Sequence, residues 1–145
     1  MNTDTRIAIP LFMGHVAAGF PNPADSYIEQ VIDLNELVIR DKDLTYFVYV
    51  ESDSMIEEHI VPGGWLIVDK GLIPENGDMI VAWVNGGFTV KRVQIVSESL
   101  LILHPANPNY APIIVHEGED YWLFGKVTFF FFEPPKYPIY GDWNR

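Results

Sequence analysis

The sequence contains no cysteine. A chain without cysteine forms no disulfide, has no thiolate nucleophile and cannot hold a metal through sulfur. This composition suits a reducing compartment, where disulfides are rare. The fold must therefore rest on packing, and 145 residues are enough for one domain that buries about 70% of the surface of its unfolded chain.

Basic residues are scarce. The chain contains nine Lys and Arg and twenty Asp and Glu, which gives a formal net charge of −11. A charge of this sign repels phosphate backbones. We therefore expect no direct DNA binding, so that a role on nucleic acid would need a partner protein.

Long apolar runs are missing as well. Residues 1–10 carry Asp4 and Arg6 and include no apolar segment of the length that a signal peptide needs. The longest apolar stretch, Val127 to Phe132 with Thr128 inside it, is far shorter than the roughly 20 residues of a membrane span. These features predict a cytoplasmic protein with no membrane association.

Proline and glycine interrupt residues 1–28, which show no sustained hydrophobic period and are predicted to form an N-terminal arm. The next segment, from Tyr27 to Arg40, fits either a short helix or an extended piece with a turn at Asp33-Leu34-Asn35. The pattern does not decide between these two structures.

Residues 29–133 are predicted to form a mostly β domain, because β-branched and aromatic runs recur between turn signals. The expected strands are Thr45 to Val50, Trp65 to Asp69, Met79 to Val84, Phe88 to Val96, Leu100 to Leu103, Ile113 to His116 and Tyr121 to Phe132. Asn85-Gly86 is the clearest hairpin turn. Residues 134–145 contain Pro134, Pro135 and Pro138 and should leave the last strand as a C-terminal tail.

The run Phe129 to Phe132 places aromatic rings on both faces of its strand. Such a strand is either central in its sheet or covered by a second subunit, and we favour the second subunit slightly.

Ser54 opens the segment Ser54-Met55-Ile56-Glu57, which has the pattern of a capping box. In that role the hydroxyl would simply accept a backbone N–H at the start of a short helix. A serine nucleophile is equally sensible at this position, because backbone amides at a helix start can stabilise the negative charge on an attacked carbonyl oxygen. The two roles are compatible.

Lys91 lies in a predicted strand, on the face that also carries Thr89, Val93 and Ile95. One interpretation is an edge-strand lysine that prevents aggregation. The other is a general base, which requires burial to move the ammonium pKa from about 10.4 toward about 7, a shift worth about 4 to 5 kcal/mol.

Val16-Ala17-Ala18-Gly19-Phe20 supplies a third element, because its small side chains suit a scissile peptide in a narrow groove. The segment lies in the N-terminal arm. Together with one serine and one strand-borne lysine it suggests a Ser-Lys peptidase whose substrate is its own chain.

Histidine chemistry is the competing mechanism, and the candidates are His15, His59, His104 and His116. None stands next to a serine in a known nucleophile motif, and their spacings are not those of metal ligands. We therefore expect ordinary structural or surface histidines, no metal and no cofactor.

These elements in this order resemble the LexA/UmuD family of self-cleaving Ser-Lys peptidases, and its UmuD branch most closely. The resemblance covers roughly Pro10 to Phe132. The matching segments are Pro10-Leu11-Phe12, Ala18-Gly19-Phe20-Pro21-Asn22-Pro23-Ala24, Tyr27-Ile28-Glu29-Gln30, Ile32-Asp33-Leu34-Asn35, Thr45-Tyr46-Phe47-Val48, Asp53-Ser54-Met55-Ile56, Leu66-Ile67-Val68-Asp69, Gly77-Asp78 and Phe88-Thr89-Val90-Lys91.

The resemblance implies that Ser54 is the nucleophile, Lys91 its base and Ala18-Gly19 the cleaved bond. The backbone amides of Asp53 and Ser54 would form the oxyanion hole. One residue departs from the family pattern near this site, because Ser52 stands where the family usually has glycine.

The resemblance also implies a LexA/UmuD-like catalytic β domain with a short helix at the nucleophile and an extended N-terminal arm. It implies a homodimer whose cleavage is stimulated by a RecA-ssDNA filament acting as co-protease. The shortened dimer would then join an UmuC-type Y-family DNA polymerase in translesion synthesis during the SOS response.

Two other functions remain open. A LexA-like or phage-repressor-like transcriptional regulator would need a helix-turn-helix before the cleavage bond, and residues 1–18 are too few to supply one. A catalytically silent polymerase-binding module would keep Ser54 and Lys91 only as cap and strand residues. A signal-peptidase relative is not expected, because it would need a membrane anchor and the sequence has no apolar run of that length.

Overall fold

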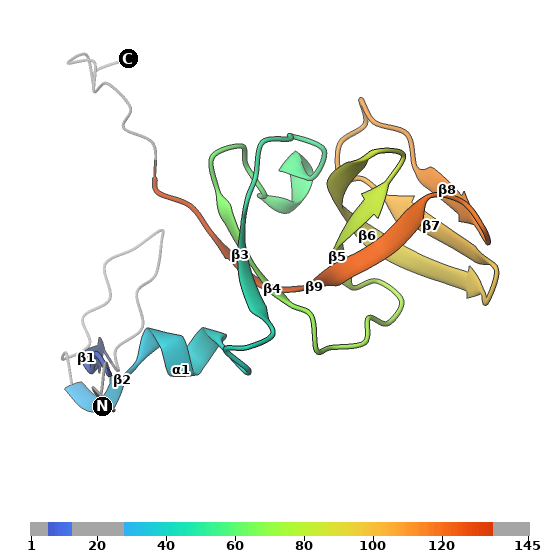
Figure 1. Cartoon of the computed structure of the whole chain (residues 1–145). Helices are drawn as coiled ribbons and strands as arrows, with labels where there is room; N and C mark the ends of the chain where they lie inside the picture. Colours follow the sequence, from blue (N-terminus) through green and yellow to red (C-terminus); the bar gives the residue numbers. More distant parts are fainter. Residues whose placement is uncertain (1–5, 13–27, 135–145) are drawn as a thin grey trace, which may run out of the picture. The chain divides into compact units, whose positions relative to one another are not determined.

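The computed structural model describes residues 6–12 and 28–134. The chain divides into two compact units, Met1–Thr45 and Tyr46–Arg145 (Figure 1). The predicted cleavage bond Ala18-Gly19 and residues 135–145 of the predicted tail lie outside the described residues, as does His15.

The first unit contains a two-stranded antiparallel sheet and one short helix. Strand β1 (Ile9–Phe12) pairs with β2 (Ile28–Ile32), and helix α1 (Leu34–Val38) follows directly. Asp33 caps the helix, because its side chain accepts a 2.9 Å hydrogen bond from the Asn35 N–H. The segment from Tyr27 to Arg40 was compatible with either a helix or an extended structure. Its described residues form a strand, β2, followed by a helix, α1.

The second unit is built on a seven-stranded sheet with the order β3-β4-β9-β5-β6-β7-β8. Its strands are β3 (Thr45–Tyr49), β4 (Trp65–Asp69), β5 (Met79–Val84), β6 (Gly87–Ser97), β7 (Leu100–His104), β8 (Ile113–His116) and β9 (Tyr121–Phe131). Each predicted strand is confirmed, with ends that differ by at most one residue. The prediction of a mostly β fold is therefore confirmed.

The β5–β6 connection is the tight hairpin that the sequence predicted. Asn85 and Gly86 both have positive φ, 50° and 85°, and Val84 pairs with Gly87. Positive φ at both central residues is the geometry of a type I′ turn, which matches the twist of the strands it joins. The turn fixes the register that places Lys91 of β6 opposite Ile80 of β5.

Strand β5 separates two apolar clusters, because its alternate residues contribute to different ones. Met79 and Val81 belong to the first, which also contains Val50, Met55, Ile60, Leu66, Val68 and Val127. Ile80, Ala82 and Val84 belong to the second, with Val93, Leu103 and Val115. Burial on both faces explains why β5 is a continuous apolar run rather than an alternating one.

Strand β9 runs along the middle of the sheet and reaches both β4 and β5 (Figure 1). Its residues Tyr121 to Lys126 pair with β5, and Phe129 to Phe131 pair with β4. The phenylalanine run therefore lies in an internal strand. Its rings are nevertheless 41–50% exposed, so the second possibility, a covering subunit, stays open.

Within residues 6–12 and 28–134, no helix combines the length and the apolar character needed to cross a bilayer.

We predict that Gly125→Ala lowers the free energy of unfolding by about 1–3 kcal/mol, the usual cost of an overpacked core. A Cβ on Gly125 would lie 2.7 Å from Val68 Cγ1 and 3.0 Å from the Asp69 carbonyl oxygen. Urea titration followed by circular dichroism measures the change.

The matched control is Gly87→Ala, another strand glycine, at which a Cβ would meet no atom within 4 Å. Its free energy of unfolding should stay within about 0.5 kcal/mol of wild type. Equal losses in the two variants would contradict the proposed close approach of β9 to β4.

Candidate active site

Ser54 lies in the loop between β3 and a single-turn 3-10 helix, η1 (Ile56–Glu58). It is 2% exposed, and the next residue, Met55, is 1% exposed within the first apolar cluster. The buried methionine anchors the loop, so the serine beside it has a fixed backbone position.

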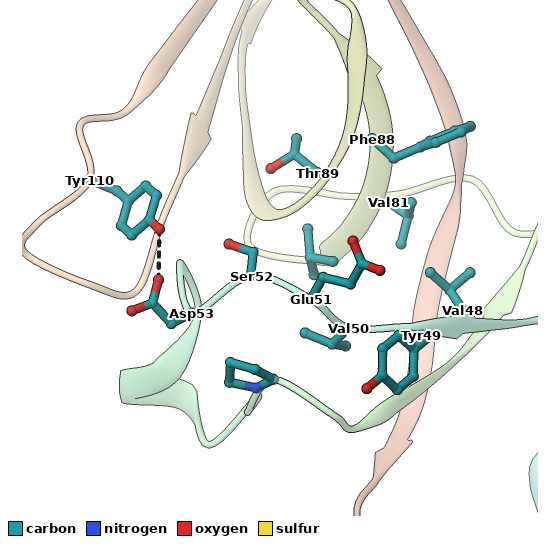
Figure 2. A pocket seen from close by; sticks show the side chains of 12 residues that line it. Val48, Tyr49, Val50, Glu51, Ser52, Asp53, Val81, Phe88, Thr89 and Tyr110 are labelled. Carbon is teal, nitrogen blue, oxygen red and sulfur yellow. Dashed lines mark hydrogen bonds between the residues drawn. The ribbon is translucent and has the colours of Figure 1, made fainter.

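A second loop, which follows β7, fastens the serine loop through its backbone. Ala106 N–H donates to the Ser54 carbonyl at 2.8 Å, and the Ala106 carbonyl accepts from Glu57 N–H at 2.8 Å. Asn107 Nδ2 donates to the Asp53 carbonyl at 3.0 Å. Tyr110 OH donates to Asp53 Oδ1 at 2.6 Å, as Figure 2 shows.

The short helix predicted at the nucleophile is present, but the capping box is not formed. The N-cap of η1 is Met55, and no side chain caps the helix there. The Ser54 hydroxyl instead makes a hydrogen bond with Lys91. The interpretation of Ser54 as a helix cap is therefore wrong.

Lys91 lies on β6, which has β5 and β7 as neighbours and is not an edge strand. The side chain is enclosed, and the residue is only 4% exposed. An edge-strand lysine that prevents aggregation has to reach solvent. The edge-strand interpretation of Lys91 is therefore wrong as well.

The Lys91 amine contacts three oxygens. Nζ lies 2.9 Å from Ser54 Oγ, 2.5 Å from Thr89 Oγ1 and 3.0 Å from the Val90 carbonyl oxygen. The fold thus brings together the serine and the lysine singled out in the sequence. The pattern had placed Thr89 on the same face as Lys91 but had not identified it as a hydrogen-bond partner.

Burial lowers the pKa of Lys91 from 10.5 to about 8. Removing the ammonium from water disfavours its charged form, and its three partners are uncharged oxygens that return little of that loss. The sequence argument expected a pKa nearer 7. A value of about 8 leaves a useful fraction of neutral amine near physiological pH.

The two amides expected in the oxyanion hole belong to the same fixed loop. The Ser54 N–H donates a 3.1 Å hydrogen bond to Ser52 Oγ. Asp53 is held on both sides, through its carbonyl by Asn107 and through its carboxylate by Tyr110. Neither Asn107 nor Tyr110 was a sequence candidate, because no local pattern links a residue to a loop more than 50 positions away.

A cavity of about 530 Å³ opens beside this loop. Residues 48–53, which include the end of β3 and the loop before Ser54, line the cavity together with Phe88, Thr89 and Val90 of β6. Figure 2 shows most of these side chains around the opening. Strand β3 is at the end of the sheet order, so its outer edge can pair with an extended peptide.

Phe88 connects the cavity to a group of tryptophans. The Trp83 and Trp122 rings are stacked with centroids 6.2 Å apart. Phe88 meets both edge-on, at 5.1 Å and 5.4 Å. One wall of the cavity is thus formed by the first ring of an aromatic cluster.

In the part of the chain that the structure describes, Ser54 makes its hydrogen bonds with Ser52, Lys91 and Ala106 and with no histidine. His104 Nε2 lies 2.7 Å from Gln94 Oε1, and His59 ends η1 in a left-handed conformation with φ 66°. His116 is exposed on β8. Within the part of the chain that the structure describes, no group of three or more acidic or histidine side chains is arranged to hold a metal ion.

Comparison with known proteins gives a family match and several relatives. The family model described as Peptidase S24-like matches residues 10–128. Protein SamA of Salmonella typhimurium is 41% identical over 122 residues, which cover 83% of each chain. Protein MucA of Escherichia coli is 33% identical over 129 residues, or 88% of this chain and 87% of MucA.

The LexA repressor of Carboxydothermus hydrogenoformans is 39% identical over 122 residues. The match covers 83% of this chain and 58% of the repressor. The shared region is therefore a part of that longer protein.

We predict that the buried Lys91 makes stability depend on pH between about 8 and 10.5. Because its pKa is lower in the folded than in the unfolded chain, the unfolded chain binds more protons in that window, and stability rises with pH. The Ser54→Ala protein should gain up to about 3 kcal/mol across the window relative to Ser54→Ala/Lys91→Met.

Urea unfolding at four pH values from 7 to 10.5 measures the difference. Both proteins carry Ser54→Ala so that neither can cleave itself, and groups that titrate in both proteins cancel. A difference that stays constant over the window would mean that Lys91 is solvated in the folded protein.

Proposed function

Because the chain belongs to the Peptidase S24-like family, we propose that it is an UmuD-like self-cleaving serine peptidase with Ser54 as nucleophile and Lys91 as general base. The 2.9 Å contact between Lys91 Nζ and Ser54 Oγ carries the proposal. Both residues are almost fully buried, which is the environment that a neutral lysine base requires.

The three contacts of Lys91 suit a neutral amine. Such an amine has two N–H bonds and one lone pair. The Val90 carbonyl can only accept a hydrogen bond, and Thr89 Oγ1 can accept a second. With both N–H bonds directed to these two oxygens, the lone pair faces Ser54 Oγ and can take its proton.

The reaction then follows the usual course of acyl transfer. Lys91 removes the Ser54 proton as Oγ attacks the Ala18 carbonyl carbon, and the amides of Asp53 and Ser54 stabilise the oxyanion. Protonated Lys91 returns the proton to the Gly19 nitrogen as the peptide bond breaks. Water then attacks the Ala18 ester, with Lys91 as base again, and releases Ser54.

The substrate we propose is the Ala18-Gly19 bond of the chain itself. The cavity beside Ser52 and Asp53 has the edge of β3 along one side, which suits an extended peptide. Small residues at the cut would let the carbonyl approach a serine that is only 2% exposed.

The biological role we propose is SOS mutagenesis. A RecA-ssDNA filament would stimulate the cut, and the product, residues 19–145, would serve an UmuC-type Y-family polymerase in translesion synthesis. The similarity to SamA and MucA over more than four fifths of the chain supports this assignment. We place the protein in the cytoplasm, and its net charge of −11 argues that the polymerase, not this chain, contacts DNA.

A homodimer is part of the proposal. Phe129, Phe130, Phe131 and Phe132 are each at least 41% exposed at one end of β9. A second copy that covers this end would remove exposed aromatic side chains from water.

The 39% identity to a LexA repressor favours a second candidate, a self-cleaving transcriptional regulator. The match covers little more than half of that repressor, and the acidic charge of this chain opposes direct DNA binding. A third candidate, a silent polymerase-binding module, is less consistent with the enclosed Ser54–Lys91 contact.

We predict that alkaline pH accelerates self-cleavage without any activator. With a Lys91 pKa of about 8, the neutral fraction and the rate should rise about tenfold from pH 7 to pH 10 and then level off. Gel densitometry gives the rate, and mass spectrometry should show that the product starts at Gly19.

Ser54→Ala should remain intact at every pH, as should Lys91→Met. Lys70→Met, which changes an exposed lysine, is the matched control and should cleave like wild type. A rate that does not change from pH 7 to pH 10, or a product starting at Gly19 from Ser54→Ala, would contradict the dyad.

We predict that an activated RecA filament supports the same cut at neutral pH. The full chain is incubated with RecA, single-stranded DNA and a nucleotide triphosphate, and intact-mass spectrometry follows the loss of residues 1–18. The filament should increase the rate of the cut at pH 7 above that of the chain incubated alone.

Omission of the single-stranded DNA is the control, and cleavage at pH 7 should then fall back to the rate of the chain alone. If cleavage at alkaline pH occurs but the filament has no effect, the peptidase assignment stands and the RecA partnership is wrong.

A further inference from the structure

The Ser52 side chain accepts a hydrogen bond from one of the two backbone amides assigned to the oxyanion hole. Its hydroxyl oxygen accepts the Ser54 N–H at 3.1 Å. Ser52 also lines the cavity beside the nucleophile, and Figure 2 shows its side chain among the lining residues. The hydroxyl therefore lies where a substrate carbonyl oxygen would have to arrive.

An amide N–H makes one strong hydrogen bond at a time. An oxyanion bound to Ser54 N–H must replace the Ser52 hydroxyl, and that exchange removes part of the stabilisation that the hole would otherwise give. A glycine at this position, as the LexA/UmuD pattern has it, offers no such competitor.

The exchange has to occur in the Ser52 side chain, because the backbone around it is held. Asn107 fixes the Asp53 carbonyl, Tyr110 fixes the Asp53 carboxylate, and Ala106 fixes the Ser54 carbonyl. Rotation about the Ser52 Cα–Cβ bond frees the amide without any movement of this loop, and it also breaks the contact between the Ser52 side chain and the Tyr110 hydroxyl.

We propose that Ser52 is a positioning residue that covers the Ser54 amide in the resting protein and thereby slows self-cleavage. This inference rests on the proposed function. It assigns to Ser52 an effect on the rate of the reaction, with no part in the proton transfer between Ser54 and Lys91.

The test compares self-cleavage of the full chain carrying Ser52→Ala with wild type between pH 7 and pH 10. Loss of one competing neutral hydrogen bond should raise the plateau rate about two- to tenfold. The midpoint of the pH profile should remain where it is in wild type, because Lys91 keeps its partners.

Two further variants separate the hydroxyl from other effects. Ser52→Gly should be at least as fast as Ser52→Ala, and Ser52→Thr, which keeps the hydroxyl, should return toward the wild-type rate. The matched control is Ser97→Ala, which removes the same kind of bond, Ser99 N–H to Ser97 Oγ at 3.3 Å, in an exposed turn after β6. Its rate should not change.

A second measurement tests the covered amide directly. Below pH 7, where cleavage is slow, the Ser54 amide proton should exchange faster with solvent in Ser52→Ala than in wild type, as followed by nuclear magnetic resonance.

The outcomes distinguish the two proposals. A wild-type chain that stays intact at all pH values overturns both. Cleavage in wild type with an equal or lower rate in Ser52→Ala overturns the role of Ser52 alone, and a lower rate would show that the hydroxyl assists the oxyanion. An unchanged Ser54 exchange rate would also overturn it.

Discussion

The contact between the Lys91 amine and the Ser54 hydroxyl is the constraint on which the arrangement of the second unit, Tyr46–Arg145, depends. A charged lysine side chain loses favourable hydration when it is buried. This loss lowers the pKa of Lys91 to about 8. The sheet maintains the contact by placing Lys91 on an internal strand and Ser54 on a loop anchored by buried Met55. A looser fold would let water in and restore the charge.

The division of the core into two clusters explains how both partners are held. Strand β5 sends alternate side chains to each cluster and also pairs with β6 through a type I′ turn that sets the position of Lys91. Met55 belongs to the first cluster and brings Ser54 toward β6. Asn107 and Tyr110 then fix the intervening Asp53 from a separate loop.

Strand positions and the hairpin could be predicted because alternation and turn residues are local signals, and Val84-Asn85-Gly86-Gly87 illustrates both. The four-residue β1 carries a proline and has no period, so its pairing with β2 could not be seen. Ser54 matched a capping box, but contact with Lys91 prevailed over the local motif. Asn107 and Tyr110 act through tertiary contact alone, which a single sequence does not display.

The aromatic wall of the cavity has an optical consequence. Phe88 touches the cavity on one side and both Trp83 and Trp122 on the other. A peptide that contacted Phe88 in the cavity would alter the surroundings of these two indole rings. Intrinsic tryptophan fluorescence would then change when the cavity is filled, and no dye would have to be attached to follow it.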